Sequence, residues 1–201
     1  MSLTLEQWDN ISSIASNSIT AITIVLGAIF GRNKINEFLS TKKKEQAFNA
    51  ALHLDKCIDN LWPIYGRLTI SSNEIMTLLT TKQQQEIGKE DFNDIQKVYQ
   101  KVTEEFSEFF SSHISIGHYG VKVKDTAMND LVRKNGHVTV AVGSFFKLVL
   151  AYINTAQQPI PTIEEVREAY DELKELKLAC GPAISAVKNI KFDDLYDFSS
   201  I

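Results

Sequence analysis

From Asn10 to Gly31 the chain reads NISSIASNSITAITIVLGAIFG, a run that contains no charged residue. A helix needs about 20 mostly apolar residues to cross the hydrocarbon core of a bilayer, so the run is long enough. Its second half, 19–30, is apolar apart from two threonines, whereas its first half is rich in serine and asparagine. We therefore predict a single membrane-spanning helix over 11–30, with a buried core helix or an interfacial segment as the alternatives.

The two flanks of this run differ in charge. Glu6 and Asp9 precede it without any lysine or arginine, and the stretch that follows, 32–45, is basic. Basic residues stay on the cytoplasmic side of a membrane segment, so we expect a single-pass protein with its N-terminus outside and its body in the cytoplasm. An acidic start also argues against a secretory signal peptide. We expect five basic residues of this stretch to contact anionic headgroups: Arg32, Lys34, Lys42, Lys43 and Lys44. The alternative is a solvated helix face.

Gly27 and Gly31 form a G-x-x-x-G motif inside the uncharged run. Two glycines four residues apart leave a flat surface on which a second helix packs closely, so both are candidate helix-association residues. A local bend of the helix is the alternative. Polar residues of the same run recur at three- and four-residue steps, which predicts hydrogen bonds between helices or a polar seam in an oligomer; they are Ser12, Ser16, Thr20 and Thr23.

The rest of the chain has helical periodicity. Its clearest apolar stripe begins after Asp91, which is well placed to cap a helix, and consists of Phe92, Ile95, Tyr99, Val102, Phe106 and Phe109. Further stripes lie within 48–65 and 163–176, and Thr162 and Glu165 have the spacing of a capping box at the start of the latter. These patterns predict an all-α fold in which an antiparallel helical bundle, 46–190, follows the first helix.

Helix-breaking residues predict where the helices end. We expect a kink or an end at Pro63, an interruption at Asn135 and Gly136, and a break at Gly181-Pro182. The segment 137–142 alternates like a strand, but its apolar pattern continues to Tyr152 and favours a helix. The alternative is a small β-hairpin within 121–142, in which 121–123 pairs with 138–140.

These predictions divide the chain into four parts. They are an N-terminal segment with the spanning helix, 1–31, a basic juxtamembrane stretch, 32–45, the helical bundle, 46–190, and an acidic-aromatic tail, 191–201. In the tail, aromatic and aliphatic residues alternate with three aspartates. Packing of these rings back onto the bundle is favoured over docking on a partner.

Composition excludes several classes of function. The chain has a net charge of −4 at pH 7, and its body lacks clustered arginines with interleaved aromatics, so no nucleic-acid partner is expected. Cys57 and Cys180 lie in separate helical patterns and are predicted to be reduced and buried. His113 falls on the apolar stripe, as a core or boundary histidine does, and the runs of glutamate within 104–108 and 164–168 fit solvated helix faces.

No known catalytic or nucleotide-binding motif occurs in the chain. We therefore predict no catalytic, cofactor-binding or metal-binding residues. We expect a non-enzymatic, membrane-anchored helical protein that self-associates as a homo-oligomer or holds a protein partner at the cytoplasmic face. In a sharper version of this hypothesis, its oligomerised spans perturb the membrane. The alternatives are a soluble all-α interaction module, whose first helix is buried in a bundle or dimer, and an enzyme without a recognisable motif.

The predicted architecture, a single span followed by a helical cytoplasmic body, resembles small bacterial membrane effectors of stress and phage defence. The resemblance implies a role of that kind as an expectation. It is a likeness of architecture, and no residue motif carries it.

Overall fold

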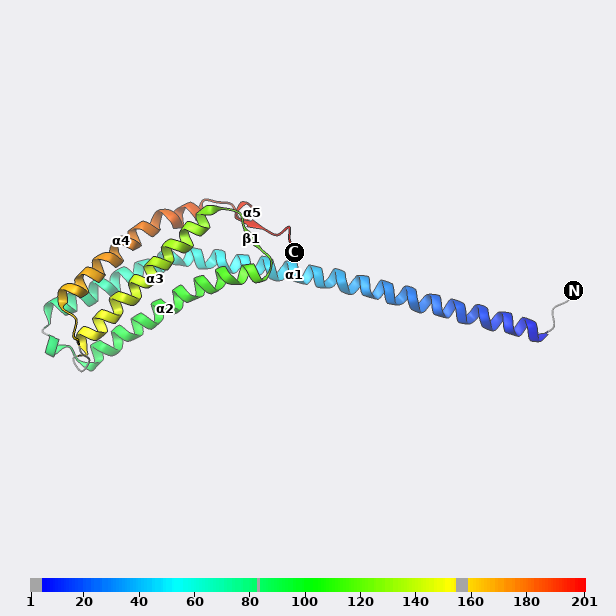
Figure 1. Cartoon of the computed structure of the whole chain (residues 1–201), viewed down its shortest axis with the longest axis horizontal. Coiled ribbons are helices and arrows are strands. Elements are labelled where there is room, and N and C mark those ends of the chain that lie inside the picture. The colour runs from blue at the N-terminus through cyan, green and yellow to red at the C-terminus, as the bar shows by residue number, and fades with distance from the viewer. Residues whose placement is uncertain (1–4, 83, 155–158) are drawn as a thin grey trace. The chain divides into compact units, whose positions relative to one another are not determined.

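The computed structural model describes residues 5–82, 84–154 and 159–201, with side chains described from Arg32 onward except for Gln85. These residues are mostly helical, which confirms the all-α class (Figure 1). The helices are α1 (Leu5–Thr81), the 3-10 turn η1 (Gln84–Glu86), α2 (Lys89–His118), α3 (Thr126–Ile153), α4 (Ile163–Lys188) and α5 (Phe192–Leu195). Two short strands complete the described part, β1 (Lys122–Val123) and β2 (Tyr196–Asp197). The chain divides into two compact units, Met1–Gln46 and Ala47–Ile201.

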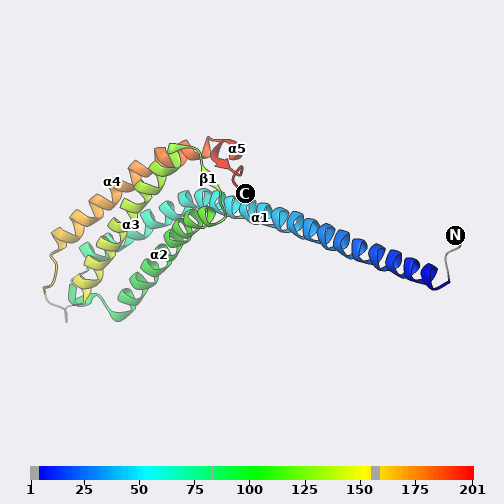
Figure 2. The ribbon, with the colours of Figure 1, turned by 45° about the vertical axis from the view of Figure 1, so that its right-hand side comes forward.

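The second unit is a four-helix bundle made by the later part of α1 together with α2, α3 and α4. Successive helices run in opposite directions, as the apolar stripes predicted (Figure 1). A view turned by 45° keeps the same helices side by side (Figure 2). The two strands and α5 lie at the end of the bundle opposite the connection between α1 and α2. The hydrophobic effect drives this arrangement, because each amphipathic helix buries its apolar face against the others.

The apolar stripe of α2 faces the core. Ile95, Val102, Phe106 and Phe109 are buried, and half-buried Tyr99 stacks on Phe146 of α3 with ring centroids 5.2 Å apart. α2 begins at Lys89 with Gly88 as its N-cap, so Asp91 lies in the first turn instead of at the cap, and its Oδ2 accepts a hydrogen bond from the backbone N–H of Gly88 at 3.0 Å. That hydrogen bond, helped by Lys82, lowers the pKa of Asp91. The stripe predicted for this helix is therefore confirmed.

The capping box at the start of α4 is also confirmed. The Thr162 backbone N–H donates to Glu165 Oε2 at 2.6 Å, and the Glu165 N–H donates to Thr162 Oγ1 at 3.2 Å. Two of the four N–H groups that a helix start leaves unpaired are satisfied in this reciprocal way.

All three predicted helix breaks are wrong as ends of helices. α1 continues through Pro63 to Thr81, α3 continues through Asn135 and Gly136, and α4 continues through Gly181-Pro182 to Lys188. In each case buried residues lie on both sides of the breaker, so packing of a long apolar face outweighs the local cost. Gly181 has a further role, because a Cβ added there would lie 3.2 Å from the ring of Trp62.

The hairpin alternative for 121–142 is wrong. β1 pairs in antiparallel register with β2, Lys122 opposite Asp197 and Val123 opposite Tyr196. The segment 138–140 belongs to α3, in agreement with the favoured helix. The tail supplies the second strand because Leu195 and Tyr196 are buried and Phe192 contacts the ring of Phe48, with centroids 5.4 Å apart. Packing of the tail onto the bundle is therefore confirmed.

A buried hydrogen bond joins α1 to α3. The Tyr65 hydroxyl on α1 donates to the Asn135 side-chain carbonyl on α3, and both residues are buried. Burial, with Cys180 as a second cause, raises the pKa of Tyr65, so this hydroxyl stays protonated at ordinary pH. The side-chain carbonyl of Asn135 thus has a partner, whereas its buried Nδ2 has none among the described residues.

We expect the Tyr65→Phe change to lower the free energy of unfolding by about 1–3 kcal/mol, because it leaves the buried side-chain carbonyl of Asn135 without a hydrogen-bond donor. Urea denaturation followed by circular dichroism measures this loss. The double change Tyr65→Phe with Asn135→Leu removes both polar groups and should recover a large part of it. A double variant that is destabilised by the sum of the two single changes would contradict this interpretation.

Candidate membrane-proximal surface on the first helix

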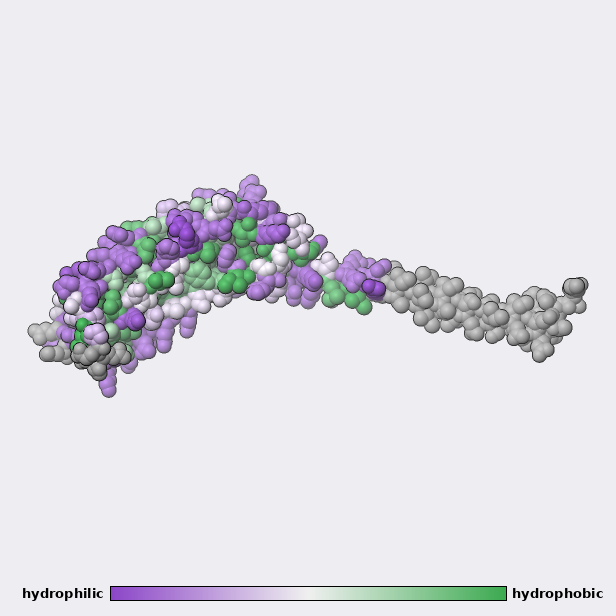
Figure 3. All heavy atoms as spheres, in the orientation of Figure 1, coloured by the Kyte–Doolittle hydropathy of each residue, from purple (hydrophilic) through white to green (hydrophobic). Residues whose placement is uncertain are grey.

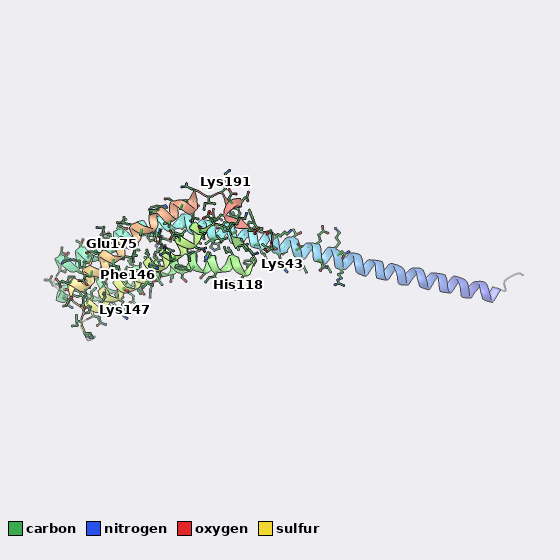
Figure 4. The ribbon with its side chains drawn as sticks, turned by 45° about the horizontal axis from the view of Figure 1, so that its top comes forward. Lys43, His118, Phe146, Lys147, Glu175 and Lys191 are labelled. Atoms are coloured by element: carbon green, nitrogen blue, oxygen red, sulfur yellow. The ribbon has the colours of Figure 1, made fainter. Side chains whose placement is uncertain are left out.

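Every side chain of α1 from Arg32 to Gln46 is exposed. The five basic residues predicted to contact headgroups lie here, and Figure 4 labels one of them, Lys43. Lys34 pairs with Glu37 at 2.8 Å. At 3.6 residues per turn, the basic positions 32, 34, 42, 43 and 44 are spread around the whole circumference of the helix. A helix that lies flat on a membrane instead separates a charged face from an apolar face.

Large apolar side chains are also exposed in this stretch. Ile35 is 60% exposed, Phe38 is 63% exposed and Leu39 is 50% exposed. Their spacing of three and four residues puts all three on one side of the helix. Figure 3 shows hydrophobic atoms next to strongly hydrophilic ones at the described start of α1. We name Ile35, Phe38 and Leu39 the apolar triad.

Gly27 and Gly31 belong to α1, but they lie outside the residues whose side chains the structure describes. The predicted span, 11–30, lies outside them as well, and both remain predictions. Their spacing nevertheless relates them to the apolar triad, because Gly27, Gly31, Ile35 and Leu39 follow one another at four-residue steps. Side chains four residues apart form one ridge along a helix.

The apolar triad is the feature that sequence reasoning missed. The sequence prediction for 32–45 considered only its basic residues. The three apolar residues among them have i, i+3, i+4 spacing, which is visible in the sequence. The structure adds that all three side chains are exposed on the surface of α1 itself.

Among the residues whose side chains are described, α3 is long and apolar enough to cross a membrane. The central helix of a globular core meets the same criteria, and nine residues of α3 are buried in the bundle. The length and composition of α3 therefore do not show that it crosses a membrane, or in which orientation.

A groove lies between α2 and α3. Its volume is about 590 Å³, and its lining includes Phe92, Tyr99, Val140, Lys147 and Leu150. Val140 is 71% exposed there. The groove thus combines an apolar wall with the ammonium group of Lys147, which Figure 4 labels on α3. Such a surface offers apolar contact, and its described lining brings no carboxylate together with a histidine for proton transfer.

The titratable residues singled out from the sequence differ in their exposure to solvent. His113 is half-buried, and burial lowers its pKa, as expected of a boundary histidine. Glu104 and Glu108 are exposed, whereas Glu105 pairs with Arg67. Cys57 and Cys180 are both free and buried, which confirms that prediction.

The fold and this surface define a class of protein, an all-α bundle whose first helix carries an exposed stretch with basic side chains and an apolar triad. No family model, no curated protein and no solved structure matches the chain.

Proposed function

We propose that the protein is a non-enzymatic, single-pass membrane protein that self-associates through its first helix and holds its helical body at the cytoplasmic face. The observation that carries this proposal is the apolar triad, which continues the ridge of Gly27 and Gly31 beyond the uncharged run. The uncharged run and its basic C-terminal flank support the span and its orientation.

The residue types along this ridge suit the two environments that it would pass through. Inside lipid there is no hydrophobic drive between helices, and close van der Waals packing over glycine favours association. In water the hydrophobic effect acts, and large apolar side chains favour association. The ridge changes from glycine to isoleucine and leucine where the uncharged run ends at Gly31, and Phe38 lies beside it. A second copy of the same helix would therefore be favoured on both sides of the membrane boundary.

The distribution of the basic residues supports an upright helix over one that lies in the interface. Arg32, Lys34 and Lys42–Lys44 surround the helix, so each of its sides could reach anionic headgroups as it leaves the membrane. An interfacial helix would have to push part of this charge into the acyl region.

Crosslinking in membranes tests the association. Gly27→Ile and Gly31→Ile block close approach while they keep the segment apolar, and we expect both to abolish the crosslinked oligomer. Phe38→Ala should weaken association by about tenfold or more, because a buried phenylalanine contributes about 1.5–3 kcal/mol.

Ala15→Ile is the matched control, since position 15 lies on the opposite side of the helix from Gly31. This variant should crosslink like the wild type. The membrane content of every variant is measured in parallel, so that loss of association is separated from loss of insertion. Unchanged crosslinking in both glycine variants and in Phe38→Ala would refute association through this ridge and would assign any oligomer to the helical body.

A further inference from the structure

A cluster of histidine, cysteine and carboxylate side chains lies between α1 and α2. His53 and Cys57 are four residues apart on α1, so they share one face of the helix, and Glu108 belongs to α2. One donor atom of each residue lies within 4.8 Å of the donor atoms of the other two. We propose that His53, Cys57 and Glu108 bind a zinc ion. Sequence motifs predicted no metal site, and this inference is independent of the proposed membrane function.

The distances within the cluster suit coordination. Cys57 Sγ lies 3.4 Å from His53 Nδ1, and Glu108 Oε1 lies 3.9 Å from the other ring nitrogen, His53 Nε2. An imidazole binds a given ion through one nitrogen, and Nδ1 is the one beside the sulfur. Zinc bonds of about 2.3 Å to sulfur and about 2.0 Å to nitrogen, at a tetrahedral angle, place those two atoms about 3.6 Å apart. The cysteine and histidine are thus already at coordination spacing. The side chains of His53 and Glu108 are 57% and 62% exposed, and the Glu108 carboxylate would have to rotate toward Nδ1 to complete the site.

The surroundings of Cys57 provide a second layer of support. The buried hydroxyl of Ser112, one turn after Glu108 on α2, lies 3.4 Å from Cys57 Sγ and can donate to a thiolate. Outer hydrogen bonds of this kind hold metal ligands in orientation.

A cavity adjoins the cluster. Its volume is about 210 Å³, and Cys57, Arg67, Glu105 and Glu108 contribute to its lining. Three protein ligands leave one position of a tetrahedral zinc ion for water, and the cavity has room for it. Arg67 is paired with Glu105, which reduces its repulsion of a cation.

The donor set selects zinc over other common cations. Magnesium and calcium prefer ligands that are all oxygen, whereas one nitrogen, one sulfur and one carboxylate oxygen suit a borderline ion. A zinc ion here would tie α1 to α2 near the start of the second unit. It would therefore raise the thermal stability of the bundle.

Cobalt(II) tests the site, because it replaces zinc and reports its ligands by colour. Full-length protein without an affinity tag is purified in detergent, freed of metal and titrated with cobalt chloride. We expect one equivalent to produce a thiolate-to-cobalt charge-transfer band and the intense visible bands of a four-coordinate ion. Zinc chloride should then abolish these bands by displacement.

Variants assign the ligands. Cys57→Ser should remove the charge-transfer band, while Cys180→Ser, which alters the other buried free cysteine, should retain it. His53→Gln and Glu108→Gln change exposed side chains and so keep the fold, and each should weaken cobalt binding tenfold or more. The proposal is overturned if the wild type gives no charge-transfer band, if Cys57→Ser keeps it, or if both exposed variants bind like the wild type.

Discussion

Replacing Phe106 by alanine is expected to lower the free energy of unfolding by about 3–5 kcal/mol. Phe106 is fully buried in the middle of α2, and its ring packs against that of Tyr65 on α1, with centroids 5.8 Å apart. The change removes most of a large side chain and leaves a cavity that helices anchored along their whole length cannot close. Chemical denaturation followed by circular dichroism measures the loss.

Ile114→Ala is the matched control on the same helix. Ile114 is exposed, so its truncation should change the free energy of unfolding by no more than about 0.5 kcal/mol. A loss below about 1 kcal/mol for Phe106→Ala would mean that this ring is not part of the core and that the stripe of α2 packs differently.

The full-length chain is expected to stay in the membrane pellet after extraction with alkaline carbonate, whereas a chain that begins at Ala47 is expected to move to the supernatant. The proposed span keeps its apolar side chains in hydrocarbon, and carbonate removes only proteins held at the surface by charge or by partners. The second unit, Ala47–Ile201, has a core of its own into which its apolar side chains pack.

A variant of the full-length chain with two charges in the span tests whether the span itself, and not the rest of the first unit, holds the protein in the membrane. Ile22→Lys together with Leu26→Lys puts two charges inside the proposed span, where a lysine costs about 2.5–3.5 kcal/mol at the helix centre and less toward the end. We expect this variant to be extracted, with a helical circular dichroism spectrum like that of the wild type. If it stays in the pellet, or if the chain from Ala47 does, the segment 11–30 is not what holds the protein in the membrane.

Much of the fold could be predicted from local patterns. The stripe of α2, the capping box at Thr162 and the helical state of 137–142 follow from period and spacing, and the structure confirms them. The helix ends predicted at Pro63, Gly136 and Gly181 were wrong, because a helix-breaking residue destabilises a helix by only a few kcal/mol. The long apolar faces on both sides of each one outweigh that cost, and their partners come from distant parts of the chain.

The candidate sites were predictable to different extents. The apolar triad could have been found from its spacing, and His53 with Cys57 is a visible i, i+4 pair. Glu108 lies far along the chain on another helix, so only the packing of α1 against α2 brings its carboxylate to them. The same holds for Lys122–Val123, whose partner strand is in the tail.

By itself the sequence determined which segments are helical, which face of each is apolar and where charge gathers, because these depend on neighbours three or four residues apart. The tertiary structure alone decided that three helices pass through their breakers, that the tail completes the sheet and that Tyr65 meets Asn135. These outcomes depend on free energies of packing between segments that are distant in the chain. Short-range sequence patterns do not specify these contacts, because the contacts form only when distant segments pack together in the folded bundle.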